Sequence, residues 1–188
     1  MHRFTALLLL HLLACAEPSS RATAPDSWVV PLFSNADGRN FQTHLSGDAE
    51  TPPRETQAQG NVKFQLAKDG SSIEYQLMAT NIDNIVAAHI HLGPPDCQCP
   101  VVVFLYGNAP AGGGRHDGVL AEGVITQANM IGPLAGQPLS ALIDQMRAGN
   151  TYVNVHTNDG VAPTNTGPGD FPGGEVRGQL DHGSAMDQ

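Results

Sequence analysis

Residues 86–107, VAAHIHLGPPDCQCPVVVFLYG, contain the pattern that decides the fold of this chain. Side chains of a β-strand point alternately to its two faces, so VAAHIHL has one wholly apolar face and a second face that bears His89 and His91. The apolar run PVVVFLYG (100–107) predicts a second strand, and the Gly, Pro, Asp and Cys residues between the two runs predict a loop. The segment therefore predicts two consecutive strands, one of which has a polar face.

Short alternating runs of the same kind recur along the chain. NVKFQLA and SIEYQLMAT, separated by a KDG turn, predict a hairpin. PLSALIDQMRAGN (138–150) has apolar residues at three- and four-residue spacing followed by a glycine, which predicts one short helix. The whole pattern predicts an all-β antiparallel sandwich crossed by that helix. The expected strands are 39–47, 61–67, 72–80, 84–92, 100–107, 118–126, 151–157 and 174–180, with WVVPLF (28–33) as a candidate strand ahead of them.

The first residues of the chain have the pattern of a targeting segment. Arg3 precedes the apolar run TALLLLHLLA, which is too short to span a bilayer and has the length typical of a signal-peptide core. The run ends in Leu-Leu-Ala-Cys, which resembles a bacterial lipobox in which Cys15 becomes the first mature residue and carries lipid. The alternative is an ordinary signal peptide that contains a cysteine. The expected organisation is a signal peptide at 1–14, the lipidated Cys15 and a flexible tether at 15–27, one domain at 28–182 and a C-terminal tail at 183–188.

The net charge of the chain indicates which class of partner it can bind. The sequence has eighteen Asp and Glu residues and nine Lys and Arg residues, which gives a formal net charge of −9. Nucleic acids are bound by neutralising phosphates, so this acidic chain is a poor candidate for that role. The expected partners are a bacterial membrane, reached through the lipid anchor, and a protein or glycan on the periplasmic or cell-surface side.

Polar side chains collect on one face of three predicted strands. In TYVNVHT (151–157) the valines form one face and the polar residues the other, and GEVRGQL (174–180) alternates in the same way. If these strands are neighbours of the His-x-His strand, their polar faces form one patch outside the core, and the long loop before Glu175 can cover it. The patch comprises His89, His91, Asn154, His156, Glu175 and Arg177.

This patch predicts a transition-metal site. Two histidines at i and i+2 on a strand can ligate one ion, and a histidine from a neighbouring strand completes a common set, which assigns His89, His91 and His156 as ligands of copper first and zinc second. Asn154, Glu175 and Arg177 would not bind the ion but would contact the ligand histidines and fix the orientation of their rings.

Other interpretations of the same residues remain open. The histidines can be solvated side chains or hydrogen-bonded braces, and Glu175 and Arg177 can form a solvated ion pair on the strand surface. His116 or Asp117, in a glycine-rich segment, is a candidate additional ligand.

Cys97 and Cys99 lie in the loop after the His-x-His strand. In an oxidising compartment they form a disulfide that staples the loop, a pair of metal thiolates suited to Cu(I), or two free thiols. No nucleophile elbow and no phosphate-binding loop is present in the sequence, so no catalytic residue is assigned.

Four motifs, in order, resemble those of the CHRD domain, a family named for chordin. They are FQTHLSGDAETPP, AAHIHLGPP…PVVVFLYG, LIDQMRAGNTYVNVHT and FPGGEVRGQL, and together they span residues 40–180. The resemblance implies an all-β, antiparallel Greek-key sandwich of immunoglobulin-like or superoxide-dismutase-like type. Animal members of the family are secreted proteins that bind signalling factors. Locally, the His-x-His strand also resembles the copper-ligand strand of copper–zinc superoxide dismutases.

Three classes of function follow from the sequence. The first is a membrane-anchored, extracytoplasmic protein of this family that binds copper or zinc through His89, His91 and His156. The second is a non-enzymatic module that binds a protein or glycan without metal. The third is a superoxide-dismutase-like redox enzyme.

Overall fold

The alternating runs of the sequence form eight antiparallel strands and one α-helix in the computed structural model of the chain, which describes residues 38–180. The predicted signal peptide, the tether, the candidate strand at 28–33 and the C-terminal tail lie outside the described residues. The strands are β1 (Asn40–Ser46), β2 (Gln59–Leu66), β3 (Ile73–Asp83), β4 (Ile85–Leu92), β5 (Val101–Tyr106), β6 (Arg115–Ile125), β7 (Thr151–Thr157) and β8 (Val176–Leu180). The helix is α1 (Leu139–Arg147).

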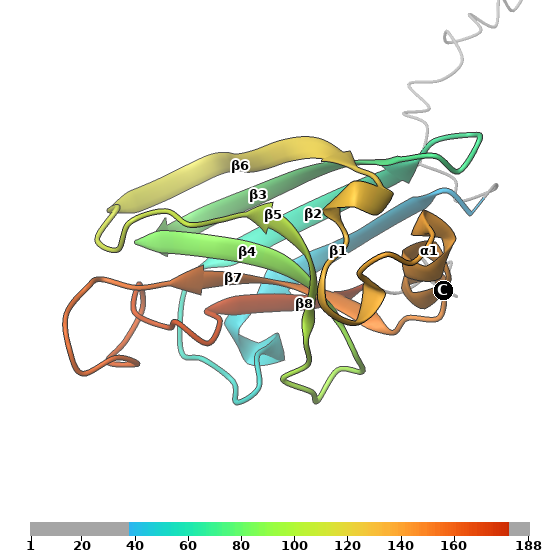
Figure 1. Cartoon of the computed structure of the whole chain (residues 1–188). Helices are drawn as coiled ribbons and strands as arrows, with labels where there is room; N and C mark the ends of the chain where they lie inside the picture. Colours follow the sequence, from blue (N-terminus) through green and yellow to red (C-terminus); the bar gives the residue numbers. More distant parts are fainter. Residues whose placement is uncertain (1–37, 181–188) are drawn as a thin grey trace, which may run out of the picture. The chain divides into compact units, whose positions relative to one another are not determined.

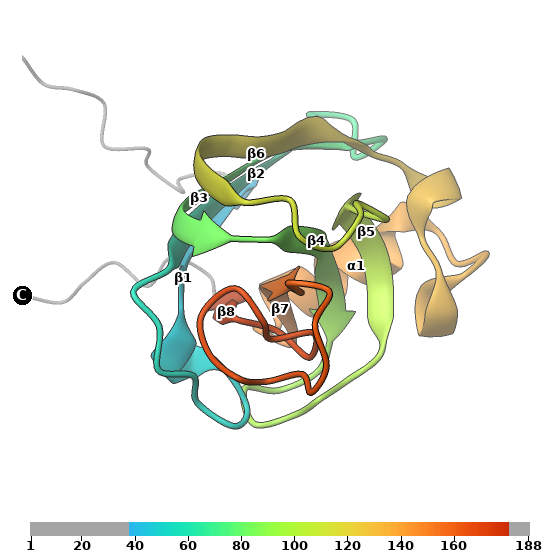
Figure 2. The ribbon, with the colours of Figure 1, turned by 90° about the vertical axis from the view of Figure 1, so that its left-hand side faces the viewer.

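The eight strands form one sheet in the order β5-β4-β7-β8-β1-β2-β3-β6, and every pairing is antiparallel. The sheet curls nearly into a barrel around its apolar face (Figures 1 and 2). The hydroxyl of Tyr75 on β3 donates to the carbonyl oxygen of Leu105 on β5 at 2.8 Å, which ties together two strands that are remote in the sheet order. The predicted all-β antiparallel architecture with one short helix is confirmed.

The core follows from the alternation in the sequence. Along β2 exposed and buried residues alternate without interruption, which places Val62, Phe64 and Leu66 inside. The helix predicted from the three- and four-residue spacing forms α1, and its Leu139, Leu142, Ile143 and Met146 are buried. Within residues 38–180, no helix has both the length and the apolar character needed to cross a membrane.

The topology brings the three strands with polar faces together. β7 lies between β4 and β8, with His89 opposite Asn154 and Asn154 opposite Arg177. These residues therefore form one row across three strands, as the alternation predicted. The register of β4 with β5 shifts beside His89 and again beside His91, and such bulges are frequent where a strand must aim a side chain.

Candidate metal centre

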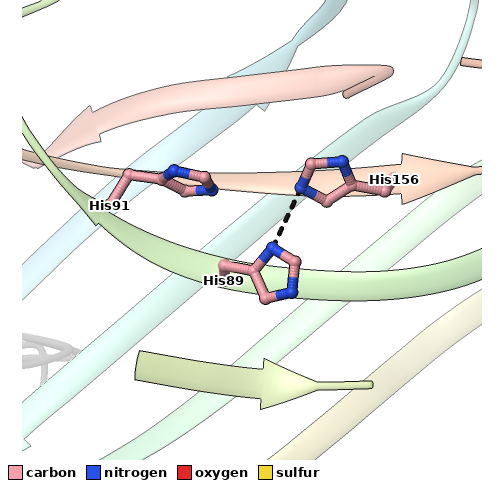
Figure 3. A group of neighbouring side chains, drawn as sticks. All are labelled: His89, His91 and His156. Atoms are coloured by element: carbon pink, nitrogen blue, oxygen red, sulfur yellow. Dashed lines mark hydrogen bonds between the residues drawn. The ribbon is translucent and has the colours of Figure 1, made fainter. Parts of the chain in front are cut away.

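Three histidine side chains converge on one point of the polar face. β4 contributes His89 and His91, and β7 contributes His156, which pairs with Ala87 in the register of the two strands. One ring nitrogen from each histidine lies within 4.8 Å of those of the other two. Figure 3 shows His89 hydrogen-bonded to His156, with His91 beside them. The structure therefore gathers the three residues that the sequence assigned as metal ligands.

Backbone carbonyl groups determine the tautomers of these rings. Nδ1 of His91 lies 2.7 Å from the carbonyl oxygen of Cys99, and Nδ1 of His156 lies 2.8 Å from that of Pro172. A carbonyl oxygen can only accept, so both Nδ1 atoms carry a proton, and each Nε2 of a neutral ring carries a lone pair. Nδ1 of His89 lies 3.0 Å from Nε2 of His156 and therefore donates to it. The lone pairs of all three neutral rings are then on Nε2.

Burial keeps the three rings neutral at pH 7. The exposed fraction is 9% for His89 and 7% for His91. Burial, reinforced by repulsion from His156 and His91, lowers the pKa of His89 to about 3. Burial also lowers the pKa of His91 and of His156 below the usual histidine value. Metal ions bind the neutral form of histidine, so no proton has to leave a charged ring before binding.

Two of the lone pairs have no partner. Nε2 of His89 and Nε2 of His91 are buried and make no hydrogen bond of normal geometry to any described residue, although the Asn154 side chain lies close enough to His91 to offset part of the fall in its pKa. Buried polar atoms of folded proteins are almost always paired, so these two atoms require an explanation. A Lewis acid bound between the rings provides one.

The ring geometry is compatible with a single ion. Zn–N bonds of about 2.0–2.1 Å place three tetrahedral nitrogen ligands roughly 3.3 Å apart. The ring nitrogens of the cluster lie within 4.8 Å of one another, which is near that spacing. An all-imidazole set suits copper and zinc, and three ligands leave a position for water or another molecule.

Two loops cover the histidines. The β7–β8 loop (residues 158–175) supplies the Pro172 carbonyl that holds His156, and Figure 2 shows this loop in orange-red at the end of the molecule that faces the viewer. The β4–β5 loop (residues 93–100) supplies the Cys99 carbonyl that holds His91. The ring of Phe104 packs edge-on against His89 with a centroid distance of 4.5 Å. The polar patch is therefore largely buried.

Tyr152 is central to the polar face, although the sequence assigned it no role. Its ring stacks on His91 with a centroid distance of 4.7 Å and an interplanar angle of 7°. The guanidinium of Arg177 lies 3.3 Å from the centroid of the same ring. Arg177 also donates to the carbonyl oxygens of Pro94 and Cys97, so it holds the β4–β5 loop rather than the histidines directly. In the sequence, the only sign of the role of Tyr152 was its position on the polar face of its strand.

Glu175 and Arg177 do not form the solvated ion pair that was one interpretation of the sequence. Glu175 has no exposed surface and Arg177 is 2% exposed. The Glu175 carboxylate accepts hydrogen bonds from the hydroxyl groups of Thr56 and Thr157 at 2.6 Å and from the N–H of Gly169 at 2.9 Å. It therefore ties the β7–β8 loop and the segment after β1 to the sheet. This links Glu175 to the histidines through the loop that holds His156.

His116 and Asp117, the candidate additional ligands, lie elsewhere. Both belong to β6, where His116 pairs with Ile82 of β3. Asp117 accepts from Arg115, and neither residue belongs to the histidine cluster.

Glu50 is a buried acid that sequence analysis did not single out. It is 5% exposed, and a Cβ atom added at Gly174 would collide with both the Glu50 carboxylate and the side-chain amide of Asn154, so these two groups lie close together. Burial raises the pKa of Glu50 to about 7, and the N–H of Thr51 and the charge of Arg177 offset this only in part. The motif GDAETPP contains Glu50, but nothing in its pattern distinguishes this acid from an exposed one.

The Glu50 carboxyl predicts a pH-dependent stability difference between wild type and Glu50→Gln. The folded chain binds more protons than the unfolded chain between the ordinary pKa of 4.5 and the folded value of about 7. The contribution of Glu50 to the free energy of unfolding therefore falls as pH rises through that window, by on the order of 2–3 kcal/mol. The neutral glutamine avoids this loss, so we expect the variant to be more stable than wild type at pH 8 and similar at pH 4.5. Urea denaturation at both pH values measures this, and a difference independent of pH would contradict it.

Comparison with known proteins gives one match. The model of the family described as the CHRD domain matches residues 41–180, which is well over half of the chain. No curated protein and no solved structure matches. The matched range contains β1 to β8 and the whole histidine cluster, except that it begins one residue inside β1.

Proposed function

The chain belongs to the CHRD-domain family, and from that premise we propose that it binds a transition-metal ion, copper or zinc, through His89, His91 and His156. Membership of the CHRD-domain family does not by itself indicate that the chain binds a metal. The proposal rests on the convergence of three neutral imidazoles, two of which have buried Nε2 lone pairs without a partner.

The residues around the cluster have distinct roles in this proposal. The carbonyls of Cys99 and Pro172 hold His91 and His156 in the tautomer that directs Nε2 toward the centre of the cluster. His89 directs its Nδ1–H toward His156, so its ring must turn to bring the Nε2 lone pair to the site, or the proton must move to Nε2, before all three rings can ligate one ion. A bound ion would supply Lewis acidity, and in the case of copper also electron transfer, at its open position.

Metal content tests the proposal. We expect purified, untagged protein to retain one zinc or copper ion per chain after exposure to Zn(II) or Cu(II) and removal of excess metal by gel filtration. Elemental analysis against protein concentration gives the ratio. A ratio indistinguishable from a buffer blank for both metals would overturn the proposal and leave a metal-free interaction module as the better reading.

The same preparation separates a binding protein from a redox enzyme. We propose binding rather than superoxide-dismutase-like catalysis, because the geometry of residues 38–180 supports a metal-binding cluster and assigns no catalytic role to any residue beside it. Superoxide consumption by the copper-loaded protein should not exceed that of an equal concentration of copper in a simple imidazole complex. A rate far above that reference would assign the enzyme class instead.

We also propose that the protein is anchored outside the cytoplasm by lipid on Cys15. The support is the Leu-Leu-Ala-Cys pattern at the end of the apolar leader and the Pro-, Ser- and Ala-rich stretch that follows it. Acyl chains contribute about 0.8 kcal/mol per buried CH₂, so several chains hold a protein on a bilayer.

Replacement of the lipidated residue tests the anchor. Expressed in a bacterial host, Cys15→Ser should move from the membrane fraction to the soluble fraction, because it lacks the acylated thiol. Fractionation and immunoblotting measure the distribution, and Cys97→Ser serves as the matched cysteine control that should remain with membranes. Unchanged partition of Cys15→Ser would contradict lipid anchoring.

A further inference from the structure

The β4–β5 loop is held by side chains of the polar face through its backbone. Arg177 donates to the carbonyl oxygens of Pro94 and Cys97 at 3.0 and 2.8 Å. The N–H of Cys99 donates to the hydroxyl of Tyr152 at 3.0 Å, and the carbonyl of the same residue accepts from Nδ1 of His91. The loop that carries Cys97 and Cys99 therefore forms one wall of the histidine site.

A disulfide between Cys97 and Cys99 closes this loop. Both sulfur atoms lie on the backbone of Gly93, two residues after His91, and a Cβ atom at that position would collide with the Sγ of Cys99. The disulfide thus joins Cys97, whose carbonyl accepts from Arg177, to Cys99, whose carbonyl accepts from His91. It fixes the position of the second carbonyl relative to the first.

We propose that the Cys97–Cys99 disulfide makes metal binding at the histidine cluster dependent on the thiol redox state. The inference rests on the proposed metal function of that cluster. With the ring closed, the Cys99 carbonyl is held against Nδ1 of His91 and directs the Nε2 lone pair to the site. With the ring open, Cys99 keeps only its N–H bond to Tyr152, so its carbonyl is less restrained and selects the tautomer and orientation of His91 less strictly.

The redox step is an ordinary thiol–disulfide exchange. A dithiol reductant transfers two electrons and two protons to the Cys97–Cys99 bond, which gives two protein thiols, and the reductant becomes a disulfide. Loss of the group that orients a metal-ligating histidine typically costs 10–100-fold in metal affinity. Once the new thiols are blocked or replaced, the histidines of the disulfide-free protein should therefore bind metal more weakly than those of the oxidised protein, although all three are still present.

The test compares zinc affinity of the full chain with and without the disulfide. Zn(II) is the probe because thiols do not reduce it. We expect the dissociation constant of Cys97→Ser/Cys99→Ser to exceed that of oxidised wild type by about 10-fold or more. Wild type that has been reduced, alkylated and freed of reagent should match the double variant. Gln98→Ala, which removes a side-chain contact to Thr51 but keeps the disulfide, is the matched control and should bind like wild type.

A second measurement distinguishes orientation of His91 from general loosening of the domain. Long-range ¹H–¹⁵N NMR of the zinc-free protein should report the Nδ1–H tautomer for His91 in the oxidised form and a mixture of tautomers in the double variant, while His156 keeps its tautomer in both. Far-UV circular dichroism checks that the variant is folded.

The outcomes separate the two proposals. Equal zinc affinity and an unchanged His91 tautomer in folded oxidised and disulfide-free protein overturn the redox inference and leave the metal proposal intact. Failure of oxidised wild type to bind zinc or copper overturns both. A loss of affinity as large in Gln98→Ala as in the double variant also overturns the redox inference, because the disulfide is then not the cause.

Discussion

His156→Ala is expected to abolish stoichiometric metal binding, with a rise in the dissociation constant for zinc of at least about 100-fold, or roughly 3 kcal/mol. The variant removes one of three nitrogen ligands from the cluster. Two nitrogen ligands, His89 and His91, would then remain for the ion. Isothermal titration or competition with a chromophoric chelator measures the change, and elemental analysis gives the stoichiometry.

Two other histidines provide controls for this prediction. His44 is exposed on β1 and lies 3.4 Å from the side-chain oxygen of Asn61, so His44→Ala should bind zinc like wild type. His116→Ala tests the residue that sequence analysis considered as an extra ligand and that the structure places on β6. Retention of wild-type affinity by folded His156→Ala would show that the cluster is not the site, and loss of binding only in His116→Ala would relocate it.

Glu175→Ala should lower the free energy of unfolding by about 3–5 kcal/mol. The carboxylate is fully buried and accepts three hydrogen bonds, from Thr56, Thr157 and Gly169. Alanine leaves two hydroxyl groups and one backbone N–H without their acceptor. Because these contacts hold the β7–β8 loop, the loss should also weaken zinc binding through His156.

Denaturant titration of Glu175→Ala, Glu175→Gln and Glu55→Ala measures the stability effect. Glutamine keeps one oxygen acceptor, so the free energy of unfolding of Glu175→Gln should lie between that of wild type and that of Glu175→Ala. Glu55 is exposed in the same loop as Thr56 and provides the matched control, with a change within about 0.5 kcal/mol. A Glu175→Ala variant that unfolds at the wild-type denaturant concentration would show that these hydrogen bonds contribute no net stability.

Much of the fold could be predicted from the sequence because strand and helix periodicity are local properties. Alternation along NVKFQLA placed Val62, Phe64 and Leu66 inside, and the structure buries all three. The spacing of the apolar residues in PLSALIDQMRAGN gave the only α-helix of residues 38–180. Alternation also assigned His89, His91 and His156 to one face, because each side chain's face depends only on its own strand.

The character of that face could not be predicted in the same way. The sequence was compatible with a solvated surface, but Arg177 and Glu175 are almost completely buried. Glu50 and Tyr152 went unassigned because their importance depends on neighbours from other strands and loops. Nothing in the spacing of Cys97 and Cys99 indicates that their backbone carbonyls fold back onto Arg177 and His91, so the sequence could not predict these contacts.

The sequence by itself determined the secondary structure, the core face of each strand and the set of polar residues on the opposite face. Tertiary structure alone decided that two loops cover this face and select the histidine tautomers. The physical reason is the range of the interactions. Strand periodicity acts over neighbouring residues, whereas the bonds that hold the loops join Arg177 to Cys97 across 80 residues and Glu175 to Thr56 across 119. Such partners are identified only once the chain has folded.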